Sequence, residues 1–385
     1  MIFPIEFMRN IRRITKLMEI SSEFRGFHVF DPDKPYLIPR AEVGVTPKIV
    51  VYNDNGVNLY RYNPITEKQY ETPLVIVYAL INKPYILDLT PERSVVRRFL
   101  QAGFDVYLID WGEADLVQQF SLDEYVDGFL YDFIEEVKAQ TNSDKVNILG
   151  YCMGGGMAAM YSALYPENVR NLILLAATLY FDKKEVGGMV KLSDKRFFDP
   201  KEIIDAYGYV PAWFLAERFK YLRPVENYIT KYINMFLNAE NKKLLEDFMR
   251  MEKWIHDGVN VAPMAYYRYV KEMYQNNALT NGRLFINGRR VDPKRITMPV
   301  AAVVGEKDHL APPPNTIRFL DYIGSKDKKI FRTPGGHVGT AISRKALAVW
   351  DEVAKWLGER SGKLIPTRDW MTCGLRYGPI CPVDF

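Results

Sequence analysis

The sequence predicts an α/β fold with a mainly parallel sheet, helices on both of its faces, and an inserted, mostly helical cap. Alternating strand and helix patterns run through residues 49–183 and resume at residue 295, an order typical of parallel sheets. The stretch between them is rich in Tyr, Phe, Met, Lys and Glu and contains helical segments. We therefore predict a core over residues 49–183 and 295–385, a cap over 184–294, and an N-terminal region over 1–48.

A sharp turn with a central cysteine follows a predicted strand at residues 145–149. Residues 150–154 read Gly-Tyr-Cys-Met-Gly, the spacing of the nucleophile turn in α/β-hydrolase folds, with cysteine where serine is usual. The small residues 155–160 predict a helix close to the sheet, and the N-terminus of that helix favours a thiolate at Cys152. Taken alone, the motif is as compatible with an inert buried cysteine as with a nucleophile.

An acid and a histidine follow in the order that hydrolase-type triads require. Residues 298–304 predict a strand, and Asp308 lies in the loop at its carboxyl end, where catalytic groups gather in parallel sheets. Residues 329–332 predict the next strand, which leads to a glycine-rich loop with His337. Of the other three histidines, two lie in no comparable loop and one directly follows the acid. We therefore predict a triad of Cys152, Asp308 and His337.

Each predicted member has a chemical task. His337 takes the proton of Cys152 to give the attacking thiolate, and Asp308 supports the imidazole. The oxyanion then needs two backbone donors, one from the residue after the nucleophile and one from the loop after an early strand. Those residues are Met153 and Ile81, the second placed only by its position after the predicted strand 74–80. The sequence thus predicts acyl transfer through a thioester.

Composition narrows the class of protein. With 48% apolar and 14% aromatic residues, the 385-residue chain can bury a large core. A net charge of +4 offers no basis for nucleic-acid binding. Three cysteines argue against a disulfide framework and fit a reducing cytoplasm, and Cys373 and Cys381 lack the spacing of a metal site. No run approaches the ~18 apolar residues of a membrane span, so we expect a soluble protein without a bound metal.

Further motifs accompany the cysteine turn. One segment follows the early strand, one ends in an Asp-Trp-Gly turn, three lead from the cap back to the core, and two surround the acid and the histidine. They are residues 81–89, 104–112, 274–277, 288–292, 296–300, 307–313 and 335–339. Together they resemble the polyhydroxyalkanoate synthases, most closely the short catalytic subunits of the two-component class III type. The chain departs from that pattern at Met153, where the family often has glutamine or valine, and at residues 178–182, where a proline is common.

The resemblance implies a substrate and a product. The substrate would be a 3-hydroxyacyl-CoA, short-chain such as 3-hydroxybutyryl-CoA, and the product a polyester formed with release of CoA. Cys152 would carry the hydroxyacyl group or the growing chain, and no cofactor would be needed besides the CoA of the substrate. Asp308 would orient His337, or also help to activate the substrate's 3-hydroxyl group.

The resemblance also implies partners and a location. Single-component members carry a longer N-terminal extension, so the short region 1–48 implies a second synthase subunit, in a homodimer or hetero-oligomer, at polyester granules in the cytoplasm. Phe7, Ile11, Ile14 and Met18 recur at helical spacing between basic residues. The helix they predict either contacts a granule or partner, or packs on the chain's own core. Charges interrupt this segment too often for a signal peptide.

Two alternatives remain open. A cysteine hydrolase of the dienelactone-hydrolase or thioesterase kind would use the same triad, with water as the acceptor. A catalytically inactive scaffold that binds granules would keep the fold without needing the triad. The long aromatic cap favours the polymerase, because a cap over Cys152 would exclude the water that ends a chain by hydrolysis.

Overall fold

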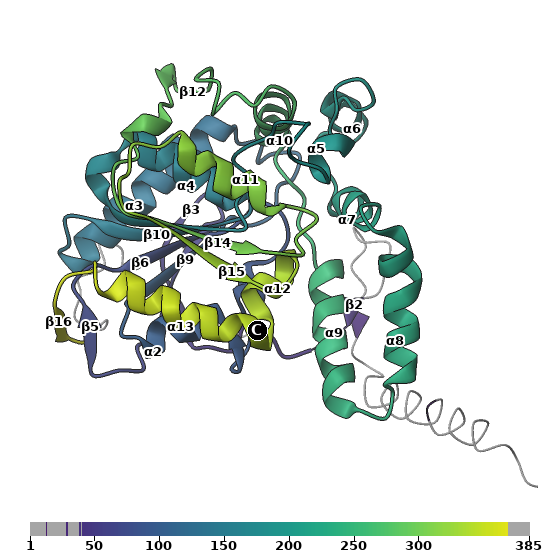
Figure 1. Cartoon of the computed structure of the whole chain (residues 1–385), viewed down its shortest axis with the longest axis horizontal. Helices are drawn as coiled ribbons and strands as arrows, with labels where there is room; N and C mark the ends of the chain where they lie inside the picture. The colour runs from purple at the N-terminus through teal and green to yellow at the C-terminus, as the bar shows by residue number, and fades with distance from the viewer. Residues whose placement is uncertain (1–12, 14–27, 30–37, 40, 369–385) are drawn as a thin grey trace, which may run out of the picture.

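A mainly parallel sheet forms the centre of the computed structural model, which describes residues 13, 28–29, 38–39 and 41–368 (Figure 1). Its strand order is β15-β14-β11-β10-β6-β9-β4-β3. Neighbouring strands are parallel from β15 to β9, whereas β4 runs antiparallel to both β9 and β3. The strands are β3 (Lys48–Asp54), β4 (Val57–Tyr62), β6 (Leu74–Val77), β9 (Val106–Asp110), β10 (Val146–Tyr151), β11 (Val169–Leu175), β14 (Val300–Gly305) and β15 (Lys328–Thr333).

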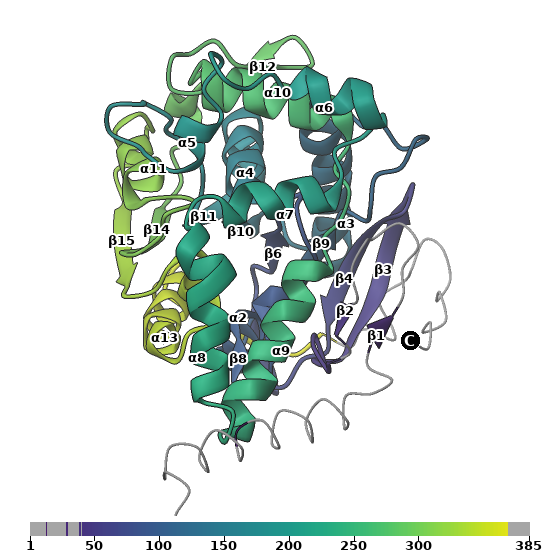
Figure 2. The same ribbon diagram turned by 90° about the vertical axis from the view of Figure 1, so that its right-hand side faces the viewer.

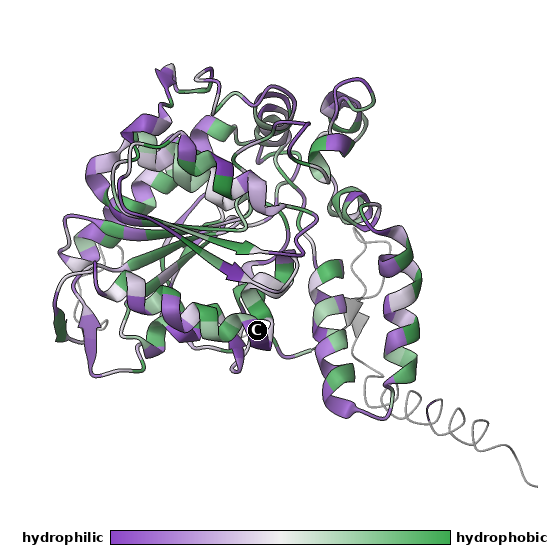
Figure 3. Ribbon diagram, in the orientation of Figure 1, coloured by the Kyte–Doolittle hydropathy of each residue, from purple (hydrophilic) through white to green (hydrophobic). Residues whose placement is uncertain are grey.

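Helices cover both faces of this sheet, which confirms the predicted α/β fold. Figure 1 shows α2 and α13 on one face and α3, α4 and α11 on the other. Every residue of β6, β10 and β14 is buried, as expected for parallel strands covered on both sides. Figure 3 shows the same contrast, with apolar strands inside and polar helix faces outside. The helices are α2 (Val95–Gln101), α3 (Leu130–Thr141), α4 (Met153–Leu164), α11 (Pro313–Ile317), α12 (His337–Ile342) and α13 (Arg344–Gly358).

The residues predicted as a cap contain mostly helices. Figure 2 shows α7, α8 and α9 in front of the carboxyl ends of the central strands. The division of the chain at residues 184 and 294 stays a prediction. The elements are α5 (Met189–Leu192), α6 (Pro200–Tyr207), α7 (Ala212–Lys220), η4 (Glu226–Thr230), α8 (Lys231–Leu237), α9 (Lys242–His256), α10 (Pro263–Arg268), η5 (Tyr269–Gln275) and the hairpin β12 (Phe285–Ile286) with β13 (Arg289–Arg290).

Short elements complete the described part of the chain. Three further strand pairs lie outside the main sheet, and 3-10 or π-helical turns join the larger elements. They are β1 (His28–Val29) with β2 (Ile38–Pro39), β5 (Lys68–Tyr70) with β16 (Leu364–Pro366), β7 (Asp88–Thr90) with β8 (Arg93–Ser94), η1 (Pro84–Leu87), η2 (Glu124–Phe129), η3 (Pro166–Asn168), η6 (Pro293–Arg295) and η7 (Arg318–Asp321).

The strand before Ile81, predicted over residues 74–80, is shorter than the sequence suggests. The apolar run continues to Leu80, yet β6 ends at Val77. The carbonyl oxygen of the next residue, Tyr78, accepts a hydrogen bond from the indole Nε1 of Trp111 at 2.8 Å. Because the Tyr78 carbonyl bonds to the Trp111 side chain, the hydrogen bonds between strands stop at Val77. The chain therefore turns toward Cys152 three residues earlier than predicted.

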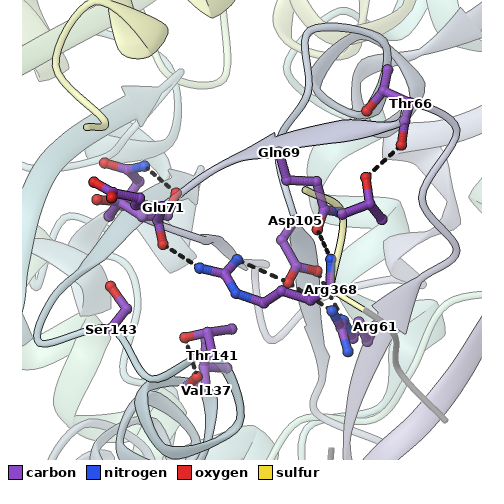
Figure 4. A network of polar contacts seen from close by, with 12 residues as sticks. Arg61, Thr66, Gln69, Glu71, Asp105, Val137, Thr141, Ser143 and Arg368 are labelled. Carbon is purple, nitrogen blue, oxygen red and sulfur yellow. Dashed lines mark hydrogen bonds and ion pairs between the residues drawn. The ribbon is translucent and has the colours of Figure 1, made fainter. Parts of the chain in front are cut away.

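A buried ionic network lies at the amino end of β9, and Figure 4 shows its polar contacts. Asp105, just before β9, accepts two hydrogen bonds from Arg61, at 2.9 and 2.8 Å. Arg368 lies 3.4 Å from the same carboxylate and donates to the Glu71 carbonyl at 2.6 Å. The network therefore joins β4, β9 and the chain that follows β16.

Some predictions fall outside the described residues. They concern the N-terminal helix with Phe7, Ile11, Ile14 and Met18, and the cysteines Cys373 and Cys381. Among the residues that the structure describes, no helix combines the length and the apolar character needed to cross a membrane.

Candidate active site

Cys152 occupies a strained turn between β10 and α4. Its backbone has φ 54° and ψ −121°, a conformation that residues other than glycine rarely adopt. The turn is held from both sides: the Cys152 amide donates to the carbonyl of Leu175 at 2.9 Å, and the Gly155 amide donates to the Cys152 carbonyl at 3.0 Å. Such strain is retained where a residue must be presented in a fixed position.

The two glycines of the motif allow this turn to pack closely. A Cβ atom at Gly150 would lie 2.5 Å from the Cα of Gly155. At Gly154 it would lie 2.3 Å from the carbonyl oxygens of Val77 and Tyr78. Since these neighbours are backbone atoms that cannot rotate away, both positions need glycine for the helix to sit on the sheet.

The predicted acid and histidine are in direct contact. The Nδ1 atom of His337 lies 2.7 Å from Oδ2 of Asp308. The other carboxylate oxygen, Oδ1, accepts hydrogen bonds from the amides of Leu310 and Ala311 at 2.9 and 2.8 Å. The Asp308 side chain is fully buried, so the carboxylate has one orientation and fixes that of the imidazole.

His337 and Cys152 face the same cavity. His337 begins α12, and its ring stacks on that of Tyr151, the residue before the cysteine, with centroids 5.2 Å apart. Burial alone lowers the pKa of His337, but the charges of Asp308 and Cys152 and the hydrogen bonds to both raise it well above 6.5. The site therefore favours the protonated form of the His337 imidazole, the form that His337 takes when it accepts a proton from cysteine.

The two predicted oxyanion donors lie in suitable elements. Met153 is the first residue of α4, and the first amides of a helix have no acceptor within it. Ile81 lines the cavity together with Cys152. The role of Met153 and Ile81 as oxyanion donors stays a prediction.

Two aromatic residues near the site carry no sequence motif, and sequence reasoning missed them. Trp254 on α9 donates its indole Nε1 to the carbonyl of Lys83 at 2.9 Å, in the loop that begins at Ile81. The hydroxyl of Tyr269 lies 3.1 Å from Oγ1 of Thr178 and 3.4 Å from the carbonyl of Met153. Both contacts join segments far apart in the sequence, so no local pattern could have indicated them.

The cavity lined by Cys152 and His337 has a volume of about 560 Å³. Apolar side chains from the core and from α7 and α9 form much of its wall, and basic side chains form another part. It is lined by Tyr78, Ala79, Ile81, Asn82, Tyr151, Cys152, Ala216, Phe219, Lys220, Leu222, Arg223, Asn227, Lys231, Trp254, Ile255, Lys307, His309, Leu310, Gly336, His337, Val338 and Gly339. This volume is in the range of sites for small organic ligands.

Comparison with known proteins places the chain in a family. The family model described as alpha/beta hydrolase fold matches residues 72–339, and the one described as Poly-beta-hydroxybutyrate polymerase (PhaC) N-terminus matches residues 31–99. The Poly(3-hydroxyalkanoate) polymerase subunit PhaC of Haloferax mediterranei is 44% identical over 361 residues, 93% of this chain and 73% of the relative. The chain belongs to the poly(3-hydroxyalkanoate) polymerase family. This confirms the resemblance inferred from the motifs.

Other relatives agree with this membership. The Poly(3-hydroxyalkanoate) polymerase subunit PhaC of Allochromatium vinosum is 36% identical over 326 residues, 83% of this chain and 90% of the relative. Among solved structures, a putative non-heme bromoperoxidase, BpoC, from Mycobacterium tuberculosis is similar with a TM-score of 0.52 and 16% identity. The similar region covers 81% of this chain and 97% of the bromoperoxidase chain. That likeness shows the fold alone.

Proposed function

We propose that the chain polymerises the acyl groups of 3-hydroxyacyl-CoA into a polyester, with Cys152 as the thioester-forming nucleophile. The supporting observation is the 2.7 Å contact between His337 and Asp308, with His337 and Cys152 lining one cavity, in a member of this family. The two relatives described above, from Haloferax mediterranei and Allochromatium vinosum, are named poly(3-hydroxyalkanoate) polymerase subunits.

The first half of the reaction loads the enzyme. His337 accepts the thiol proton of Cys152, and the thiolate attacks the carbonyl carbon of the substrate thioester. The amides of Met153 and Ile81 stabilise the tetrahedral oxyanion. Collapse breaks the bond between the carbonyl carbon and the CoA sulfur, and the CoA thiolate leaves with the proton held by His337. Cys152 then carries the hydroxyacyl group.

The second half extends the chain. The 3-hydroxyl group of another acyl unit loses its proton to His337, whose charge Asp308 supports, and its oxygen attacks the Cys152 thioester. An ester bond forms as the carbon–sulfur bond breaks. Water could attack the same thioester, and the apolar cavity wall contributed by Phe219 and Ile255 opposes its entry. No cofactor is needed beyond the CoA of the substrate.

The proposal includes a partner and a location. The relatives from Haloferax mediterranei and Allochromatium vinosum are named subunits. This supports the proposal that the active assembly contains a second protein. A polyester product supports association with polymer granules. We propose a short-chain substrate, 3-hydroxybutyryl-CoA, as the first to examine.

The experiment follows CoA release from 3-hydroxybutyryl-CoA and identifies the product by mass and size, with and without a candidate second subunit. The wild-type protein should release CoA and form a polymer of high molecular weight, and Cys152→Ala should do neither. Release of CoA with only free 3-hydroxybutyrate would favour a hydrolase instead. Turnover that persists in a folded Cys152→Ala protein would refute the cysteine as nucleophile.

A further inference from the structure

Among the described side chains that line the active-site cavity, lysine and arginine occur but aspartate and glutamate do not. The four cations are Lys220, Arg223, Lys231 and Lys307. The whole chain has nearly balanced charges, with 51 Lys and Arg against 47 Asp and Glu. Composition alone therefore does not account for a wall with four cations and no acid.

A second cavity on the same chain provides a contrast. It has a similar volume, about 600 Å³, and lies beside α9, away from Cys152. Five basic and four acidic side chains line it, so its charges nearly cancel. Segregation of positive charge is thus a property of the cavity with the cysteine, and not of every polar hollow on this protein.

The four cations approach the cavity from two parts of the chain. Lys220 ends α7, Arg223 follows in the next turn, and Lys231 begins α8, whereas Lys307 lies in the core loop directly before Asp308. An anion held among them would contact the helices in front of the sheet and the core at once.

Neighbouring carboxylates neutralise these cations only in part. Lys220 pairs with Glu217 and Lys231 with Glu252, each at 2.8 Å, and neither glutamate lines the cavity. Arg223 has a long contact of 3.7 Å with Glu226, with both side chains about half exposed, a geometry that contributes little. Lys307 is exposed and forms no ion pair with any described residue. At least Arg223 and Lys307 thus have charge available for a ligand.

We propose that Arg223 and Lys307, assisted by Lys220 and Lys231, bind the phosphate groups of the CoA part of the substrate. This inference rests on the proposed function. In an acyl-CoA the flexible pantetheine arm separates the thioester from the diphosphate and the 3′-phosphate. With the thioester at Cys152, the apolar wall formed by Phe219, Ile255 and Leu310 suits the arm, and the cations suit the phosphates.

The kinetic test compares two thioesters of 3-hydroxybutyrate, one with CoA and one with N-acetylcysteamine, which has no phosphate. Arg223→Ala and Lys307→Ala together should raise KM for the CoA thioester about tenfold, with a much smaller change in kcat. KM for the N-acetylcysteamine thioester should rise much less than KM for the CoA thioester, and KM for the CoA thioester should depend less on salt. Arg223→Lys, which keeps the positive charge, should have a KM for the CoA thioester close to that of the wild type. An equal rise in KM for both thioesters, or no rise, would overturn the proposal.

Lys326→Ala is the matched control. Lys326 is also exposed and lies just before β15, at the end of that strand opposite to the His337 loop. Its removal changes the net charge by the same amount as the loss of Lys307 without touching the cavity. A rise in KM equal to that of Lys307→Ala would show a general charge effect and contradict a phosphate site.

A binding measurement separates this proposal from the proposed function. Calorimetry with the Cys152→Ala protein should show CoA binding more tightly than pantetheine, and the two cation substitutions should abolish that preference. If CoA is preferred in this way but no polymer forms from any thioester, the phosphate site stands and the polymerase proposal fails. Equal affinity for CoA and pantetheine would refute the phosphate site, whatever the product of the reaction.

Discussion

The indole Nε1 of Trp254 donates a hydrogen bond to the carbonyl oxygen of Lys83 at 2.9 Å. This bond joins α9 to the loop that begins at Ile81, the predicted second oxyanion donor. The hydroxyl of Tyr85 bonds to Oδ2 of Asp257, just past the end of α9, at 3.2 Å and forms a second link between the same two segments. The helix in front of the sheet therefore helps to hold the loop that faces Cys152.

Trp254→Phe should reduce kcat about tenfold while the protein remains folded. Phenylalanine keeps most of the apolar packing at this site, but it cannot donate to the Lys83 carbonyl, and the Ile81 amide becomes less fixed. The loss of one hydrogen bond costs only about 1 kcal/mol of stability. The measurement is kcat from CoA release, with Trp213→Phe on α7 as the control. An equal loss in both variants would contradict a specific role for the bond.

Asp308→Asn should lower the pKa of His337 and reduce kcat by about 10⁴-fold, the loss seen when a triad acid becomes an amide. The asparagine Oδ1 can still accept from Leu310 and Ala311, so the loop should keep its shape. The pKa is measured by NMR titration of the imidazole. A wild-type titration near 6.5, unchanged in the variant, would refute the electrostatic role of Asp308.

The same substitution should change how stability depends on pH. Since the folded-state pKa of His337 is raised above 6.5, the stabilisation from its charge is complete below the unfolded-state pKa. It is lost as the pH rises through the folded-state value. The difference in unfolding free energy between wild type and Asp308→Asn should therefore be largest at slightly acidic pH and shrink toward alkaline pH. Urea unfolding at several pH values measures it, and a difference that grows with pH would have the wrong sign.

Gly154→Ala should destabilise the protein by about 3 kcal/mol or more, or prevent folding. The added Cβ would lie 2.3 Å from the carbonyl oxygens of Val77 and Tyr78, and backbone atoms cannot yield as a flexible side chain does. Gly187→Ala is the control, because a Cβ there meets nothing within 4 Å. Thermal unfolding compares the two, and a stable Gly154→Ala protein would show that the turn tolerates a side chain.

The main sheet and the positions of Cys152, Asp308 and His337 could be predicted because their signals are local. Cys152, Asp308 and His337 each follow a strand, and β10, β14 and β15 are parallel members of one sheet. Their carboxyl ends therefore meet at one edge, and the order of the motifs along the chain was enough to predict that the three residues come together. Glycine at positions 150 and 154 likewise has a local cause in the tight turn.

The contacts that arise from tertiary packing could not be predicted. The apolar run 74–80 reads as a strand to its end, but the indole of Trp111 takes the Tyr78 carbonyl and stops β6 at Val77. Trp254 and Lys83 are 171 residues apart, and although Lys83 lies in the motif 81–89, Trp254 belongs to no motif that could pair with it. Three of the cavity cations lie within residues 220–231 and the fourth is Lys307, and only the packing of α7 and α8 in front of the sheet brings the two groups to one cavity.

Asp105→Asn should destabilise the protein by about 3–5 kcal/mol, because it removes the buried charge that pairs with both Arg61 and Arg368. Asp105 precedes β9 whereas Cys152 follows β10, so the network lies at the opposite end of the parallel strands and kcat of the folded fraction should stay at the wild-type value. Asp351→Asn is the matched control: its pair with Arg98, at 3.3 Å, is exposed and should contribute less than about 1 kcal/mol. Urea unfolding gives both numbers, and similar losses in the two variants would show that burial of the ion pair is not what stabilises this edge.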